Sequence, residues 1–173
     1  MDAREQAWLF TGGGLPPTPH AIERRRIMTG QPLPHIYGAL ARGEPTGPVT
    51  AESPGLVVLD TAPSAEFGGA GDRWSPETLL IASIADCFVL TFRAVSRSAA
   101  FDWRHLECQV EGVLERVDRV AQFSGYTTRA ILTIPDGADA TQARRLLEKA
   151  EHGCLIANSL RGSRTLQVDV RHG

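Results

Sequence analysis

The chain has 173 residues, of which 42% are hydrophobic and 22% charged, and its net charge is -2. These values are typical of one soluble domain that buries its own core, and the scattered basic residues exclude a nucleic-acid-binding surface. The first 14 residues contain no apolar signal core, and the longest apolar stretch, residues 79–90, is shorter than a membrane span. We therefore expect a cytoplasmic protein with no membrane association.

Residues 1–35 differ in composition from the remainder, because they contain a run of three glycines and a proline pair without sustained periodicity. We interpret them as a partly flexible N-terminal extension with one helical turn near residues 21–28. A domain covering residues 36–173 then follows. Its first part, up to Thr61, is predicted to form short strands, one of them at residues 56–59, separated by glycine- and proline-rich turns.

The best-marked helix begins after Ser75. Ser75 is a typical N-cap, Pro76 suits the first helical position, and Glu77 lies in the first turn, where the helix dipole favours an acid. The pattern predicts a helix that continues to about Ser98. Because residues 79–90 are apolar around nearly the whole circumference, we expect this helix to be buried in a core or in a dimer interface.

Two alternating segments follow, at residues 104–115 and 122–134, and they predict a hairpin of half-buried strands. The residues expected on the apolar face are Leu106, Cys108, Val110, Leu114, Tyr126, Thr128, Ala130, Leu132 and Ile134. An amphipathic helix is predicted from Thr141 to a C-cap at Gly153, and a last strand at residues 166–170. The order of elements is that of an α+β fold.

The three cysteines are the candidates for chemistry, because a cytoplasmic chain does not use them as a disulfide framework. Cys87 lies inside the apolar helix and Cys154 directly follows a helix cap, so each is either a packed core residue or one half of a reactive pair. A pair requires Cα atoms within about 7 Å of each other. Cys108, on the apolar face of its strand, is interpreted as a core residue.

Other kinds of site find little support in the sequence. A zinc site would need His105, Cys108, His152 and Cys154 together, but no Cys-x-x-Cys pair is present. The glycine-rich run at residues 68–71 does not match a phosphate-binding loop, and no nucleophile elbow of the Gly-x-Ser-x-Gly kind occurs. We therefore expect neither a metal nor a cofactor.

Two segments of the chain carry a further pattern. In the first, GGAGDRWSPETLL at residues 68–80 is followed by ADCF at residues 85–88, so a glycine-rich loop precedes a Pro-Glu-x-Leu helix start and a cysteine comes ten residues after the glutamate. The second is CLIANSL, residues 154–160, with the valine-rich strand after it. Together they resemble the OsmC/Ohr family of hydroperoxide reductases, which has the same loop, helix start and cysteine spacing. The likeness covers roughly residues 36–172. It departs from the family at Leu155, where proline is usual, and at Asp86, where a small residue is common.

The resemblance implies an intertwined homodimer, with central buried helices and antiparallel sheets outside. It also implies a thiol-dependent peroxidase that reduces organic hydroperoxides in an antioxidant, stress-response role. Cys87 would be the peroxidatic cysteine, and Cys154 the resolving cysteine that forms a redox-active disulfide with it. The reductant would be a dithiol, which is a dihydrolipoyl protein for Ohr-like members. The alternative is an OsmC-like protein that binds a ligand or senses redox state without turnover, or a structural dimer with incidental cysteines.

In the family an arginine from the N-terminal strands supports the thiolate and is held by the Pro-Glu glutamate. The resemblance assigns the glutamate to Glu77 and the arginine to Arg42, with Arg73 and Arg93 as rivals. Ten residues on one helix span about 15 Å. Glu77 and Cys87 would therefore have to come from different subunits to share a site.

The walls of a substrate pocket near Cys87 are assigned to four apolar helix residues, which favour organic hydroperoxides over hydrogen peroxide. They are Leu79, Leu80, Phe88 and Phe92. The alternative is that these side chains only fill the core.

Overall fold

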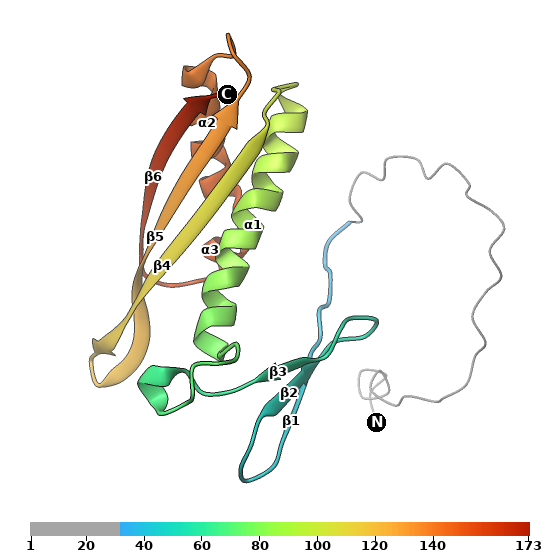
Figure 1. The fold of residues 1–173 in the computed structure, drawn as a ribbon, viewed down its shortest axis with the longest axis vertical. Coiled ribbons are helices and arrows are strands. Elements are labelled where there is room, and N and C mark those ends of the chain that lie inside the picture. The colour runs from blue at the N-terminus through green and yellow to red at the C-terminus, as the bar shows by residue number, and fades with distance from the viewer. Residues whose placement is uncertain (1–31) are drawn as a thin grey trace, which may run out of the picture. The chain divides into compact units, whose positions relative to one another are not determined.

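The computed structural model describes residues 32–173, drawn in colour in Figure 1. The helical turn expected near residues 21–28 lies outside the described residues. The residues from Gly38 to Gly173 form one compact unit. The elements are β1 (Leu40–Gly43), β2 (Val49–Glu52), β3 (Leu59–Thr61), the 3-10 turn η2 (Ala65–Phe67), α1 (Pro76–Ser98), β4 (His105–Val117), β5 (Val120–Ile134), α2 (Ala140–Gly153), α3 (Leu155–Asn158) and β6 (Ser163–His172). The α+β class predicted from the sequence is confirmed. The boundary between extension and domain stays a prediction.

The strands β1, β2 and β3 form a small antiparallel sheet. Gly47 and Gly55, in the turns between them, have positive φ angles of 96° and 75°, which suit glycine. The prediction of a strand over residues 56–59 was wrong for most of its length. The strand begins only at Leu59, because Leu56 closes the preceding turn through a backbone hydrogen bond to Ser53 of 3.1 Å.

The helix α1 begins as predicted. The Ser75 hydroxyl accepts a hydrogen bond from the Thr78 backbone N–H (3.2 Å), and the Ser75 N–H donates to the Thr78 hydroxyl (2.8 Å). This reciprocal pair satisfies two backbone groups that the helix end would otherwise leave without partners. The helix then runs without interruption through Cys87 to Ser98, so the predicted 23-residue element is confirmed.

Only one side of α1 is buried within the chain. The buried residues are Ile84, Phe88, Phe92 and Ser96. On the other side Asp86 and Arg93 are exposed, and Leu90 keeps 51% of its surface exposed. Burial around the whole circumference is therefore not reached within one chain, and the apolar outer face requires another cover.

The composition of α1 also meets the requirement for crossing a membrane, since an 18-residue window of Pro76–Ser98 has a mean hydropathy of 1.8. The sequence prediction that this segment falls short of a span rested on residues 79–90 alone. One such helix is weak support for a membrane segment, because core helices of globular proteins have the same composition. Here its inner face packs on a sheet and on α2.

The second sheet has the order β4-β5-β6 and is mixed. The predicted hairpin is confirmed, with β4 antiparallel to β5 from Val117–Val120 to His105–Thr133. The expectation of antiparallel sheets was wrong for β6, which runs parallel to β5. The reason is the connection: α2 carries the chain back along the sheet before β6 begins, as parallel neighbours require (Figure 1).

The core lies between this sheet and the two long helices. The predicted apolar face of β5 is confirmed, because the side chains of Tyr126, Thr128, Ala130, Leu132 and Ile134 alternate as buried residues along the strand. Of these, Ala130, Leu132 and Ile134 share one core cluster with Phe88 and Phe92 of α1 and a stripe on α2. The stripe consists of Ala143, Leu146, Leu147 and Ala150, as its helical spacing predicts.

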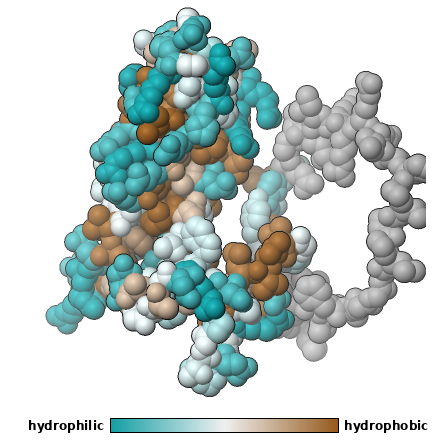
Figure 2. Space-filling view, viewed as in Figure 1, coloured by the Kyte–Doolittle hydropathy of each residue, from teal (hydrophilic) through white to brown (hydrophobic). Residues whose placement is uncertain are grey.

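Apolar side chains also remain on the surface, and Figure 2 shows brown apolar surface interrupting the hydrophilic teal on the face in view. The large apolar residues of the first sheet and α1 that are exposed include Leu40, Val49, Leu56, Val57, Val58, Leu59 and Leu90. Large apolar side chains that stay exposed in such numbers are typical of an interface between chains. It accords with the dimer that the resemblance implies.

Candidate active site

Cys87 and Cys154 come together in the fold. Cys87 lies on α1 and is half-buried, whereas Cys154 lies at the junction of α2 and α3 and is only 1% exposed. Both belong to one apolar cluster with Ile84 and Tyr126. Both are free thiols, and they lie close enough for each to shift the pKa of the other. The fold therefore brings together the two cysteines that the sequence singled out as a pair.

The surroundings of Cys87 favour its thiolate. Burial by itself would raise the pKa of this thiol, but hydrogen bonds from its neighbours outweigh the burial and lower it. The donors are the backbone N–H groups of Ile156 and Leu155, the thiol of Cys154 and the hydroxyl of Thr91, whose Oγ1 is 3.9 Å from the sulfur. Donors that point at a sulfur stabilise negative charge on it.

The surroundings of Cys154 favour its protonated form. Burial, together with the neighbouring Cys87, raises its pKa to about 11. Its sulfur lies 4.0 Å from the carbonyl oxygen of Ile84, on the turn of α1 just before Cys87. At neutral pH the pair therefore consists of one activated sulfur and one thiol that keeps its proton, the division of labour of a nucleophile and a second, later-reacting cysteine.

Cys108 takes no direct part in this arrangement. It is partly buried against the core, as the sequence predicted, and burial raises its pKa to about 12. A thiol with such a pKa is inert at neutral pH. The conceivable zinc ligands His105, Cys108, His152 and Cys154 do not converge: within residues 32–173, no three metal-ligating side chains form a cluster.

Glu77 and Arg42 are not joined within one chain. Arg42 forms an ion pair with Glu52 on the neighbouring strand and is largely exposed. The Oε2 atom of Glu77 is buried, and no described residue donates a hydrogen bond to it. A buried carboxylate oxygen without a donor is costly, so this position calls for a cationic or N–H partner. The assignment of Arg42 to that role stays a prediction, as do its rivals Arg73 and Arg93, both exposed.

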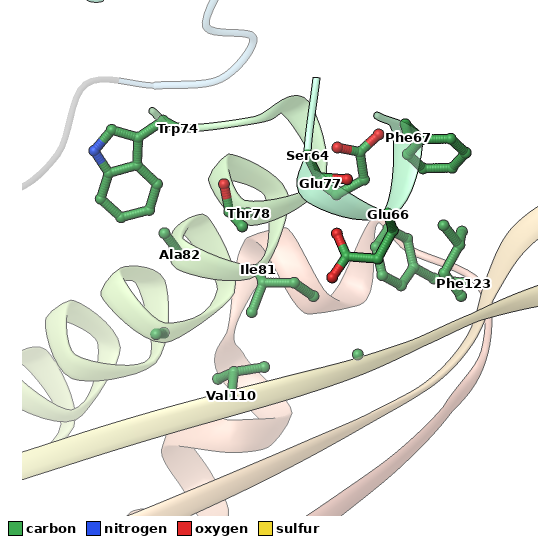
Figure 3. Close-up of a pocket in the computed structure, with 13 residues that line it drawn as sticks. Ser64, Glu66, Phe67, Trp74, Glu77, Thr78, Ile81, Ala82, Val110 and Phe123 are labelled. Carbon is green, nitrogen blue, oxygen red and sulfur yellow. The ribbon is translucent and has the colours of Figure 1, made fainter. Parts of the chain in front are cut away.

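A cavity of about 520 Å³ opens beside Glu77. Figure 3 shows Trp74 and Phe123 at opposite sides of it, with Ile81 and Val110 between them. Its lining is mostly apolar, with a few polar groups at one side, as is usual for sites that bind small organic molecules. Gly112 also lines it; a Cβ added there would come within 2.5 Å of Ile81, so glycine keeps this wall open.

The predicted pocket walls were wrong in part. Phe88 and Phe92 are 1% and 0% exposed and belong to the core, because they point to the side of α1 that packs on the sheet. The sequence analysis also missed Thr91 and the N–H groups of Leu155 and Ile156. Thr91 was detectable from its spacing of four residues after Cys87 on a helix, but the backbone donors depend on how α3 packs.

Comparisons with known proteins identify relatives of this chain. The family model described as OsmC-like protein matches residues 69–169. Peroxiredoxin OsmC of Escherichia coli is 25% identical over 137 residues, which cover 79% of this chain and 93% of that protein. An uncharacterised protein of Bacillus subtilis, YmaD, is 25% identical over 124 residues, or 70% of this chain and 82% of its own.

Among solved structures, the organic hydroperoxide resistance protein OsmC of Legionella pneumophila is similar, with 28% identity and a TM-score of 0.63 over 79% of this chain and 97% of that one. That protein is also described as a predicted redox protein. The matched family segment contains Glu77, Cys87 and Cys154, and the folds are similar. The chain therefore belongs to the OsmC-like protein family.

Proposed function

We propose that this protein is a thiol-dependent peroxidase that reduces organic hydroperoxides, with Cys87 as peroxidatic and Cys154 as resolving cysteine. The observation that carries the proposal is the contact between the two thiols, one with a lowered pKa and one with a raised pKa. The membership of peroxiredoxin OsmC and of hydroperoxide resistance proteins in the same family supports the reaction class.

The proposed reaction has three steps. The Cys87 thiolate attacks the terminal peroxide oxygen, the O–O bond breaks, and the alkoxide leaves and takes up a proton as the alcohol, so that Cys87 becomes a sulfenic acid. The Cys154 sulfur, losing its proton, then attacks the sulfenic sulfur, and the oxygen leaves as water. Finally a dithiol donor, which we propose to be a dihydrolipoyl protein, reduces the disulfide and is itself oxidised.

The proposal includes a homodimer, because Glu77 and Cys87 are separated by about 15 Å along one continuous helix. In a dimer the Glu77 carboxylate and the Arg42 guanidinium would support the Cys87 thiolate of the other copy. Two observations support this arrangement: no residue from 32 to 173 donates a hydrogen bond to the buried Glu77 oxygen, and the outer face of α1 is apolar. The same cover would keep α1 away from a membrane.

The apolar cavity supports the proposed substrate class. Trp74, Ile81 and Phe123 offer apolar contact to an organic group but no advantage to hydrogen peroxide. We propose a cytoplasmic location for the same reaction, since its free thiols require a reducing compartment.

The test is steady-state turnover of cumene hydroperoxide by the full chain, with dihydrolipoamide or dithiothreitol as the electron donor. Continuous alcohol formation that depends on both substrates supports the peroxidase. If the protein oxidises once and stops although the donor is present, the function is redox sensing or ligand binding instead. Hydrogen peroxide is the matched comparison, and we expect it to be the poorer substrate.

A further inference from the structure

A basic residue of the second sheet binds side chains on both sides of Cys154 in the sequence. Arg164, near the start of β6, has its Nε atom 3.4 Å from Oε1 of Glu151, in the last turn of α2. Its Nη1 atom donates a hydrogen bond of 2.8 Å to Oδ1 of Asn158, at the end of α3. One planar guanidinium therefore holds an acceptor on either side of Cys154 in the sequence.

The segment between these two anchors is closed by its own hydrogen bonds. The Asn158 amide donates to the carbonyl of His152 (2.9 Å), and the Asn158 N–H donates to the carbonyl of Cys154 (2.9 Å). The Cys154 N–H donates to the carbonyl of Glu151 (3.2 Å). We call residues 151–158 the cysteine corner. It is tied internally at several points, so it is expected to move as one piece.

The Arg164 contact is partly withdrawn from water. Its side chain is 33% exposed and that of Glu151 is 15% exposed. Arg164 and Glu151 also line the same small internal cavity as Cys154. A half-buried pair differs from a surface ion pair, because removal of one partner leaves the other charge poorly solvated and free to seek a new position.

We propose that Arg164 is a positioning residue of the cysteine pair, fixing the cysteine corner so that Cys154 and the N–H groups of Leu155 and Ile156 remain directed at Cys87. Arg164 itself does not touch the sulfurs; it acts through Glu151 and Asn158. The expected effect of Arg164 on peroxide turnover rests on the proposed function. Its expected effects on the titration of Cys87 and on disulfide formation do not, because the pair can be oxidised without a peroxide.

The effects on the two thiols follow from the short distances that thiolate stabilisation and disulfide formation require. The N–H donors stabilise the Cys87 thiolate only while they point at its sulfur, and a disulfide forms only when the two sulfurs approach to about 2.05 Å. Misplacement of a reacting group by about 1 Å is enough to reduce a rate by about 100-fold. Freeing the cysteine corner therefore weakens both the activation of Cys87 and the closure of the disulfide.

The experiment compares Arg164→Gln with Arg129→Gln in the full chain. Arg129 is a matched control, because it also holds a carboxylate, Glu111 (2.7 Å), and a side-chain amide, Gln167 (3.0 Å), but these partners lie on β4 and β6. Two readouts are taken: the ultraviolet titration of the Cys87 thiolate, and the rate at which diamide closes the Cys87–Cys154 disulfide. Thermal unfolding checks that each variant is folded.

We expect Arg164→Gln to shift the Cys87 titration to higher pH and to slow disulfide closure at least about tenfold. Arg164→Lys keeps the charge near Glu151 but loses the forked geometry, so we expect an intermediate rate. We expect Arg129→Gln to match the wild type in both readouts. A general loss of stability would instead affect both arginine variants without moving the Cys87 titration.

Wild-type titration and closure rates in a folded Arg164→Gln protein would overturn the inference. If that variant fails to fold, Asn158→Ala removes one arm of the contact, and wild-type values in that protein overturn the inference equally. A wild-type chain that closes its disulfide with diamide but does not turn over peroxide would contradict the proposed function alone. The role of Arg164 would then be judged from the same two readouts.

Discussion

The thiols of Cys87 and Cys154 share one apolar cluster, and their pKa values are shifted in opposite directions. Burial raises the pKa of Cys154 to about 11. Cys87 is also desolvated, but its donors, foremost the Ile156 N–H, lower its pKa in spite of that burial. The difference supports the proposed order of events, in which Cys87 reacts first and Cys154 reacts once Cys87 has been oxidised.

Replacement of the first sulfur is the simplest test of that order. We expect Cys87→Ser to reduce hydroperoxide turnover by at least about 1000-fold, because a serine hydroxyl is not ionised at neutral pH. Serine is close to isosteric, so thermal unfolding and the oligomeric state should be retained. Substantial residual turnover in the folded variant would remove Cys87 from the proposed role.

Replacement of the second sulfur should stop the reaction one step later. In Cys154→Ser the first step still forms a sulfenic acid on Cys87, but no neighbouring thiol is present to condense with it. We expect the sulfenic acid to persist long enough to be trapped with dimedone and identified by mass spectrometry. An intramolecular disulfide that still forms rapidly in this variant would show that Cys154 is not the partner of Cys87.

The residue after Cys154 offers a test of the backbone donors. Leu155 is 75% exposed and begins α3, where proline is tolerated, and Cys154 has the extended ψ of 107° that proline requires before it. Leu155→Pro removes one N–H donor to Cys87, so we expect the Cys87 titration to move to higher pH.

Leu155→Ala is the control for that substitution, because it removes the same exposed side chain but keeps the N–H. It should titrate like the wild type. If the proline and alanine variants titrate alike, the Leu155 N–H contributes nothing to the thiolate.

The buried thiols predict a loss of stability at alkaline pH. Between about pH 9 and 11, the unfolded chain releases the protons of Cys108 and Cys154, whereas the folded chain keeps them because their pKa values are about 12 and 11. The folded state then binds more protons, so the free energy of unfolding falls as pH rises. We expect Cys108→Ala to make this fall less steep in urea titrations. An identical pH slope in both proteins would contradict the burial of that thiol.

The outer face of α1 predicts where the proposed dimer forms. Leu90 is 51% exposed in one chain, so Leu90→Glu should leave the folded subunit intact. Burying an apolar side chain stabilises an interface by about 1.5–3 kcal/mol, and a symmetric dimer buries it twice. We therefore expect dimer dissociation to increase at least about 100-fold, measured by analytical ultracentrifugation. An unchanged dimer would place the interface elsewhere.

Local chemistry explains which parts of the fold were predictable from the sequence. The start of α1 follows from Ser75 and Pro76, and the faces of β4 and β5 follow from the alternation of their side chains. The direction of β6 was not predictable from its own residues, since parallel pairing depends on the path of α2. Phe88 and Phe92 were mistaken for pocket walls, because an apolar helix face does not reveal what it packs against.

The candidate site was predictable to a similar extent. Cysteine positions and the resemblance indicated Cys87 and Cys154, and the fold brings them together. The groups that surround these cysteines and shift their pKa values could not be predicted in the same way. Backbone N–H groups at residues 155 and 156 carry no sequence signature, and Arg164 approaches the pair only through the pairing of β6 with β5. The roles of Glu77 and Arg42 stay predictions, because a single chain does not join them.

The most direct measurement is stopped-flow oxidation of the reduced protein by substoichiometric cumene hydroperoxide, with mass spectrometric mapping of the cysteines and hydrogen peroxide as the comparison. The account predicts rapid formation of a Cys87–Cys154 disulfide, faster with the organic peroxide, while Cys108 stays reduced. Slow oxidation without preference among the three cysteines or between the two peroxides would contradict it.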